Sequence, residues 1–236
     1  NKNSYIISDK SHNNPIDLDL EKFHIPDVNT IVFINGHYST KLSDKIDGVQ
    51  LMTGLEYFKY KNFSANYLSD CPFELLNTAF MDSGMSIIIN KNQTPDKPIR
   101  FLFFTSAGEN IMISPRINID CKENSSVTFL EHFVGSSNNF FINSSINCSL
   151  DKNSSMRHIK IIGESKNGTI FNKNNIQQKH NSKYDFLQFS YDLNLSRTKI
   201  ETKLNGDGAE CSLNGLSLSR ETQQLGTHII TNHFTP

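Results

Sequence analysis

Short β-prone runs separated by polar corners dominate the chain from about residue 86 onward. A new run begins about every 13 to 16 residues, and Asn, Ser, Gly, Asp and Lys fill the gaps. Many runs alternate apolar and polar residues, which is typical of a strand with one buried face. The pattern predicts a mainly β fold and no amphipathic helix in this region. The runs begin near Ser86, Ile99, Ile113, Ser126, Phe140, Ser155, Thr169, Lys183, Arg197, Glu210 and Gly226.

Two architectures are compatible with this spacing. An antiparallel sandwich usually has turns every 8–12 residues and short hairpin loops. A parallel β-helix stacks similar repeats and places small polar residues at its corners. The steady interval of about 14 residues leaves the two architectures equally open. In the β-helix, one strand and one corner per interval, with two intervals per coil, would give about five coils.

The β-helix interpretation predicts a pair of buried thiols. Cys121 and Cys148 lie 27 residues apart, about one coil, and both occupy inward positions in their runs. They are therefore expected to stack on adjacent coils, with backbones about 5 Å apart. Such a pair could pass sulfur or bind a metal, but cysteine acting as a small apolar residue in a narrow core is favoured.

Residues 1–84 are predicted to form a small peripheral α/β segment, and residues 85–236 the β-helix core. Thr30–Ile34 predicts a strand that ends in a turn at Asn35–Gly36. Apolar residues at helical spacing predict a helix over Leu51–Leu68. A second helix is expected over Phe73–Phe80, directly after Pro72.

Composition excludes several partners. The net charge is −1, so no basic surface for nucleic acid is expected. No apolar run approaches the roughly 18 residues of a membrane span. Four cysteines without a CxxC motif or a signal-peptide pattern favour reduced thiols and a cytoplasmic location. The 28 asparagines suit left-handed corners, and the chain is interpreted as a piece of a longer protein.

No catalytic residue is predicted. Only one of Glu131 and His132 can face the interior of a strand, and a structural hydrogen-bonded group is favoured there. His158 and Lys160 are assigned to an outward, solvent-exposed face. Cys121, Cys148 and His233 are the candidate metal ligands. His228 and His233 are five residues apart and would face opposite sides of a strand, so a metal site formed by these two histidines is not expected.

Several stretches, taken together, resemble the SufB/SufD family of the SUF iron–sulfur cluster assembly machinery. FINGHY and LNGDGAECSLNGL are the most specific of them, and the first is more similar to SufD members than to SufB members. The stretches occur in family order over about residues 30–236. They are Val32–Tyr38, Leu42–Asp44, Phe73–Phe80, Pro98–Phe103, Phe129–Gly135, Leu204–Leu216 and Thr231–His233.

The resemblance implies a right-handed parallel β-helix and a non-catalytic scaffold subunit. It implies a heterodimer with a SufB-like paralogue and docking of a SufC-like ATPase, with the iron–sulfur cluster assembled by the full complex. No cofactor is expected on this chain alone. The family's Cys-Ser-His-Gly-like motif and helical ATPase-docking segment have no counterpart here, so no functional residue is carried over.

Other readings stay open at this point. A carbohydrate-active β-helix enzyme would need a dense row of carboxylates on one outer face. Outward positions here are mainly Lys, Asn and Ser. A surface adhesin and a homodimer of the isolated chain are also open. In the scaffold interpretation, the partner is expected to continue the last rung, near Thr227–Phe234.

Overall fold

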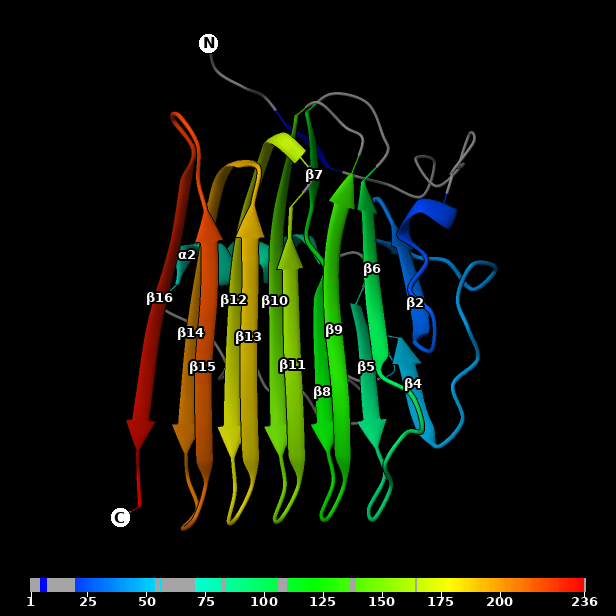
Figure 1. The fold of residues 1–236 in the computed structure, drawn as a ribbon, viewed down its shortest axis with the longest axis vertical. Helices are drawn as coiled ribbons and strands as arrows, with labels where there is room; N and C mark the ends of the chain where they lie inside the picture. The colour runs from blue at the N-terminus through cyan, green and yellow to red at the C-terminus, as the bar shows by residue number, and fades with distance from the viewer. Residues whose placement is uncertain are drawn as a thin grey trace.

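The computed structural model describes residues 5–7, 20–53, 56, 71–81, 84–105, 110–135, 139–163 and 165–235. Two facing sheets dominate this part of the chain, and the strands of each follow one another in sequence order across the molecule (Figure 1). The coils stack side by side, from β5 and β6 at one end to β15 and β16 at the other.

One sheet, called sheet A, has the strand order β16-β14-β12-β10-β8-β5-β4, with β7 beside β10 and β1 beside β7. Its strands are β1 (Ile6–Ile7), β4 (Val49–Thr53), β5 (Gly84–Ile89), β7 (Ile111–Ile113), β8 (Arg116–Cys121), β10 (Phe140–Leu150), β12 (Ser165–Gln178), β14 (Leu193–Leu204) and β16 (Gln224–His233).

The other sheet, sheet B, has the order β15-β13-β11-β9-β6-β2-β3. Its strands are β2 (Asn29–Ile34), β3 (His37–Tyr38), β6 (Ile99–Thr105), β9 (Ser126–Gly135), β11 (Ser155–Ile162), β13 (Lys183–Tyr191) and β15 (Glu210–Leu218). The described helices are the 3₁₀ turn η2 (Leu20–Phe23) and the α-helix α2 (Pro72–Phe80).

Parallel pairing between coils confirms the β-helix. Gly84 pairs with Arg116 and Thr169 pairs with Leu195, so partner residues lie 32 and 26 positions apart. Among the described strands, antiparallel pairing is confined to β2 with β3 and β4 with β5. A sandwich built from hairpins is therefore excluded, and about five coils form as predicted.

The N-terminal predictions have mixed outcomes. The strand over Thr30–Ile34 and the helix over Phe73–Phe80 are confirmed by β2 and α2. The helix over Leu51–Leu68 is wrong at its start, because Leu51–Thr53 belongs to β4, which pairs with β5. The rest of that stretch, apart from Glu56, lies outside the described residues. The division between residues 84 and 85 stays a prediction.

The interior changes character along the coils. Near the N-terminal end it is filled by rings, including Phe33, Phe101, Phe129 and Phe133. Toward the C-terminal end, amides and hydroxyls take the equivalent inward positions, and Asn172 hydrogen-bonds to Ser144 and Thr198 there. These buried polar residues are Asn172, Asn174, Gln178, Ser196, Thr198 and Thr202. The ladder of strands thus encloses both an apolar and a polar section.

Asparagines form one corner of the coils. Asn92, Asn124, Asn153 and Asn181 all have positive φ, between 52° and 61°, a conformation that asparagine adopts more readily than most residues. Asn124 Nδ2 donates to Asn92 Oδ1 at 2.8 Å, and Asn153 Nδ2 donates to Asn124 Oδ1 at 3.0 Å. The abundance of asparagine therefore has a structural role at this corner.

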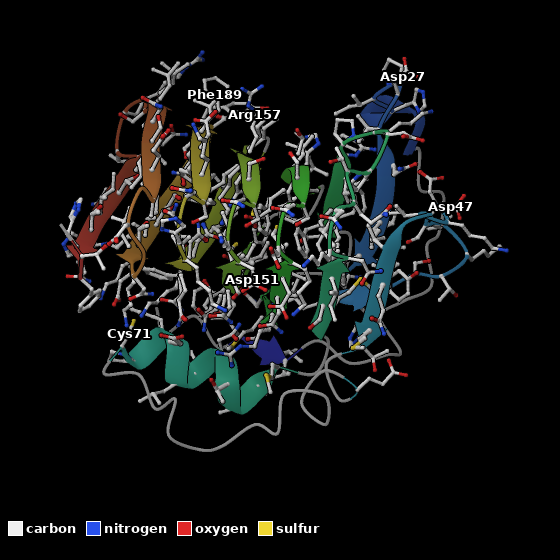
Figure 2. The ribbon with its side chains drawn as sticks, turned by 90° about the horizontal axis from the view of Figure 1, so that it is seen from below. Asp27, Asp47, Cys71, Asp151, Arg157 and Phe189 are labelled. Atoms are coloured by element: carbon white, nitrogen blue, oxygen red, sulfur yellow. The ribbon has the colours of Figure 1, made fainter. Side chains whose placement is uncertain are left out.

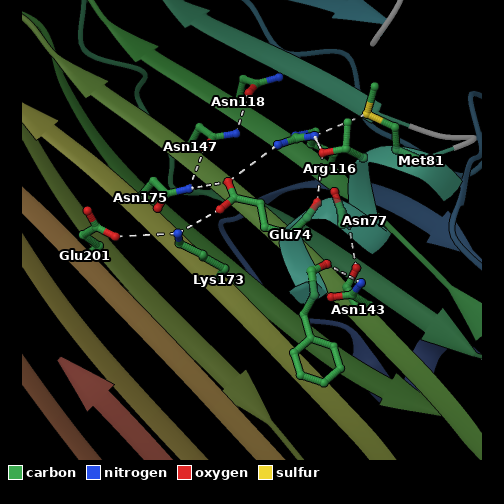
Figure 3. A network of polar contacts seen from close by, with 12 residues as sticks. Glu74, Asn77, Met81, Arg116, Asn118, Asn143, Asn147, Lys173, Asn175 and Glu201 are labelled. Atoms are coloured by element: carbon green, nitrogen blue, oxygen red, sulfur yellow. Dashed lines mark hydrogen bonds and ion pairs between the residues drawn. The ribbon is translucent and has the colours of Figure 1, made fainter. Parts of the chain in front are cut away.

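Helix α2 lies on the outer face of sheet A, whereas Arg157 and Phe189 point away from the outer face of sheet B (Figure 2). Glu74 of α2 binds Lys173 Nζ at 2.8 Å and lies 3.8 Å from Arg116 Nη2. Asn77 Nδ2 donates to the carbonyl oxygen of Asn143 at 2.7 Å. This network fixes the helix across strands that come from three different coils (Figure 3).

Candidate functional site

The two predicted core thiols both lie in the interior, but they do not stack. Cys148 pairs with Ile119, and Cys121 pairs with Leu150. One coil spans 29 residues here, not 27, so the thiols sit on neighbouring strands displaced by two positions. The predicted direct stacking is therefore wrong, although the inward orientation of both side chains is confirmed.

His233 lies far from both thiols along the coil axis. It ends β16, in register with Leu204 of β14, and is exposed. Within the described residues no three His, Cys, Asp or Glu side chains lie close enough together to hold a metal ion. The structure thus does not bring Cys121, Cys148 and His233 into one site.

Burial controls the chemistry of the core thiols. It raises the pKa of Cys121 to about 12, with further contributions from Asp120 and Asp151. Burial also raises the pKa of Cys148 well above its ordinary value. Because the thiolate is the reactive form, both groups are expected to be inert in the folded protein.

The four cysteines differ in burial, and this difference predicts selective alkylation. Iodoacetamide at neutral pH is expected to modify Cys71 and Cys211, which are partly exposed, well before Cys121 and Cys148. Peptide mass spectrometry after a timed reaction would measure the order, and all four thiols should react in denaturant. Rapid labelling of Cys148 in the folded chain would contradict the buried placement.

The most unusual feature of the interior is a cluster of charged and polar groups. Glu131 of β9, His158 and Lys160 of β11, Asn174 of β12 and Tyr184 of β13 are all buried. The sequence-based assignment of His158 and Lys160 to solvent is wrong. They share the inward face of β11 with Met156 and Ile162, while the isoleucines between them face outward.

The cluster is tightly connected. Glu131 Oε1 lies 2.5 Å from His158 Nε2 and 3.1 Å from Lys160 Nζ. Lys160 Nζ also donates to Asn174 Oδ1 at 3.0 Å, and Tyr184 Oη lies 2.8 Å from His158 Nδ1. The second carboxylate oxygen of Glu131 has no hydrogen-bond partner. Lys160 and His158 thus both contact Oε1 of the buried Glu131 carboxylate, and Oε2 has no hydrogen-bond partner.

The pKa values define the charge states. Burial raises the pKa of Glu131, but the charge of Lys160 and the hydrogen bond from His158 outweigh burial and lower it overall. Burial lowers the pKa of His158 more than Glu131 raises it, so the imidazole is neutral at pH 7. Its Nε2–H then donates to Glu131, and its Nδ1 accepts a hydrogen bond from the hydroxyl group of Tyr184, whose pKa is raised by burial.

This geometry is that of an internal ion cluster. All members lie inside the coil, away from solvent, and the groups that contact them belong to neighbouring rungs. A dissolved substrate would not reach them in this arrangement. Sequence reasoning missed the cluster because Ile159 and Ile161 give one face of β11 as much apolar character as Met156 and Ile162 give the face that carries His158 and Lys160.

The terminal coil presents a different type of surface. Within the described chain, β15 pairs only with β13 and β16 only with β14, which leaves one edge of each strand unpaired. Ile229 stands in register with buried Ile200, yet it is 46% exposed. A hollow of about 320 Å³ opens there between the two sheets. Leu216, Leu218 and Phe234 are also exposed on this coil and the residues after it.

Such an edge can accept another strand. Unpaired backbone N–H and C=O groups form a template for β-sheet extension, and the exposed apolar side chains offer area for burial. The structure thus has a closed, ion-containing interior, and within the described chain β15 and β16 are each paired on one side.

None of the described helices is long and apolar enough to cross a membrane.

Comparison with known proteins identifies related sequences. A family model described as "SUF system FeS cluster assembly, SufBD core domain" matches residues 103–236, more than half of the chain. A curated iron–sulfur cluster assembly SufBD family protein of Synechocystis sp. is 31% identical over 132 residues. That alignment covers 50% of this chain and 29% of the relative, so the match spans less than a third of that relative's length.

Proposed function

Since the chain belongs to the SufBD family of the SUF system for iron–sulfur cluster assembly, we propose that it is a non-catalytic scaffold subunit of the SufD type. It would pair with a SufB-like subunit and act together with a SufC-like ATPase in the cytoplasm. Cluster assembly would take place in the full complex and not on this chain alone.

The match of residues 103–236 to the SufBD core domain is the observation that best supports the scaffold role. A partner that adds its own strands beside β15 and β16 would satisfy their unpaired backbone groups and bury Ile229. The closed interior around Glu131 supports a structural role for the coil itself. The carbohydrate-active alternative is not favoured, because the outer-face carboxylates Glu74 and Glu201 are tied to lysines.

Co-purification tests the proposed partner surface. The 236-residue chain, co-expressed with the SufB-like and SufC-like proteins of the same source, is expected to elute as one complex. Ile229→Asp is expected to abolish co-elution because it places a charge at the centre of the edge.

Leu187→Asp is the matched control, since Leu187 is similarly exposed, at 48%, but lies on the outer face of β13. Circular dichroism would verify that both variants fold. Equal co-elution of the Ile229→Asp chain and the unchanged chain would refute strand addition at this edge.

A further inference from the structure

The outer face of sheet A carries a groove of about 650 Å³ beside the beginning of α2. Its floor consists of outward side chains on β12, β14 and β16, and Cys71 and Phe73 form one wall. Figure 2 places Cys71 at the start of α2, on the side of the C-terminal strands. The turn before β16, with Ser219 and Gln223, forms the opposite wall.

Every fully charged residue that lines this groove is basic. Lys173, Arg197 and Lys199 line it together with His228, and no described Asp or Glu side chain does. The whole chain has a net charge of −1, so this local excess of positive charge departs from the average surface. The groove is therefore a region of positive potential with a defined shape.

The strand register concentrates the charges in one row. Lys173, Lys199 and His228 are direct neighbours on β12, β14 and β16. Adjacent strands lie about 4.8 Å apart, and like charges directly opposite one another are destabilising. The two adjacent lysines, Lys173 and Lys199, thus carry an electrostatic cost within the sheet.

Of the two lysines, only Lys173 is neutralised by described residues of the chain itself. Lys173 Nζ lies 2.8 Å from Glu74 and 3.6 Å from Glu201. Among the described residues, neither Lys199 nor Arg197 forms an ion pair. A bound anion would supply the missing negative charge.

The next row of paired residues combines an aromatic ring, a guanidinium group and a glycine. Phe171, Arg197 and Gly226 are direct neighbours on the same three strands. The ring of Phe171 stacks on that of Phe73, with centroids 4.2 Å apart. A Cβ atom on Gly226 would meet nothing closer than the carbonyl oxygen of Ser196 at 4.0 Å, so the glycine leaves a hollow beside the guanidinium.

We propose that this groove binds a small organic anion. Its phosphate or carboxylate group would be held by Arg197 and Lys199, and its apolar body would lie along Phe171 and Leu195 above Gly226. The guanidinium fork suits both anionic groups. The groove volume falls within the range of about 300–1,000 Å³ that is typical of small-molecule sites. The groove shares β16 with the terminal coil, but it lies on the outer face of sheet A, and its binding does not depend on the proposed partner surface.

Three aromatic probes test the proposal on the 236-residue chain: phenyl phosphate, benzoate and uncharged phenol. Isothermal titration calorimetry is expected to give saturable 1:1 binding for at least one of the two anions and none for phenol. The tighter of the two shows whether the site prefers a phosphate or a carboxylate group. Absence of binding by both anions, or equal binding of phenol, would overturn the proposal.

Variants assign the binding to this groove. Arg197→Gln and Lys199→Gln are each expected to weaken binding by about tenfold or more, because each removes a charge-assisted hydrogen bond. Gly226→Leu is expected to abolish binding by filling the hollow. Lys183→Gln, an exposed lysine on β13 of the other sheet, is the matched control and should bind like the unchanged chain.

Thermal unfolding separates binding from folding. Lys199→Gln is expected to keep or raise the Tm of the ligand-free chain, since the substitution relieves repulsion with Lys173. A lower Tm would show that Lys199 has a structural role, and unchanged affinity in both charge variants would show that the anion binds elsewhere. Either result counts against the groove.

Discussion

Replacing Lys160 with methionine is expected to reduce the free energy of unfolding by about 3 to 5 kcal/mol, the usual effect of breaking a buried ion pair. Lys160 is buried, and its Nζ is 3.1 Å from Glu131 Oε1. Methionine has a similar length but leaves the carboxylate without its counter-charge. Urea unfolding monitored by circular dichroism would measure the loss.

Two further variants separate charge from packing. Lys183→Met removes an exposed lysine that lies 3.0 Å from Glu210, and it should cost about 1 kcal/mol or less. Adding Glu131→Gln to Lys160→Met removes the isolated charge, so the double variant should be less destabilised than the sum of the single variants. Strict additivity would mean that the two groups do not interact.

Replacing Phe129 with alanine is expected to cost about 3 to 5 kcal/mol, the range for removing a buried aromatic ring. Phe129 is 1% exposed, and its ring centroid lies 4.9 Å from that of Phe101 and 5.3 Å from that of His158. The cavity would adjoin the charged cluster, because the ring of Phe129 packs beside the imidazole of His158. The same urea experiment would measure the effect.

Leu187→Ala is the control for this truncation. Leu187 is also a large apolar residue of sheet B, but it points outward from β13 and is half-exposed. Its loss should change stability by about 0.5 kcal/mol or less. An equal loss of stability in both variants would indicate that the buried ring of Phe129 contributes no more to stability than an exposed side chain does.

The fold could be predicted from the sequence because a β-helix repeats its pattern locally. The interval between runs, the polar corners and the alternation within each strand are all properties of short segments. The strand over Thr30–Ile34 and the helix after Pro72 were predictable for the same reason. Each depends on neighbours within a few residues.

Which residues of β11 face inward could not be derived from such a local pattern. The isoleucines at 159 and 161 suggested the inward face, and His158 and Lys160 the outward one. The true phase places Lys160 inside because Glu131, 29 residues earlier in the pairing register, neutralises it. A local pattern does not contain that partner.

The cysteine register and the groove depend on still longer relationships. Coil length differs from rung to rung, so a separation of 27 residues did not place Cys148 beside Cys121. The groove exists because α2 lies against strands about 100 residues further along, as the hydrogen bond between Glu74 and Asn175 illustrates. Neither relationship has a signal within a short segment.

The distance between paired residues has a consequence for how quickly the chain acquires its structure. Each new rung must close a loop of about one coil before its first backbone hydrogen bond forms, since Ser126 pairs with Ser155 and Ser155 pairs with Lys183. Chains dominated by such non-local pairing fold slowly. During synthesis, however, the earlier rungs emerge first and provide an edge for the next one. Growth would then proceed rung by rung in the direction of translation, and refolding of the whole chain from denaturant should be slower than this vectorial route.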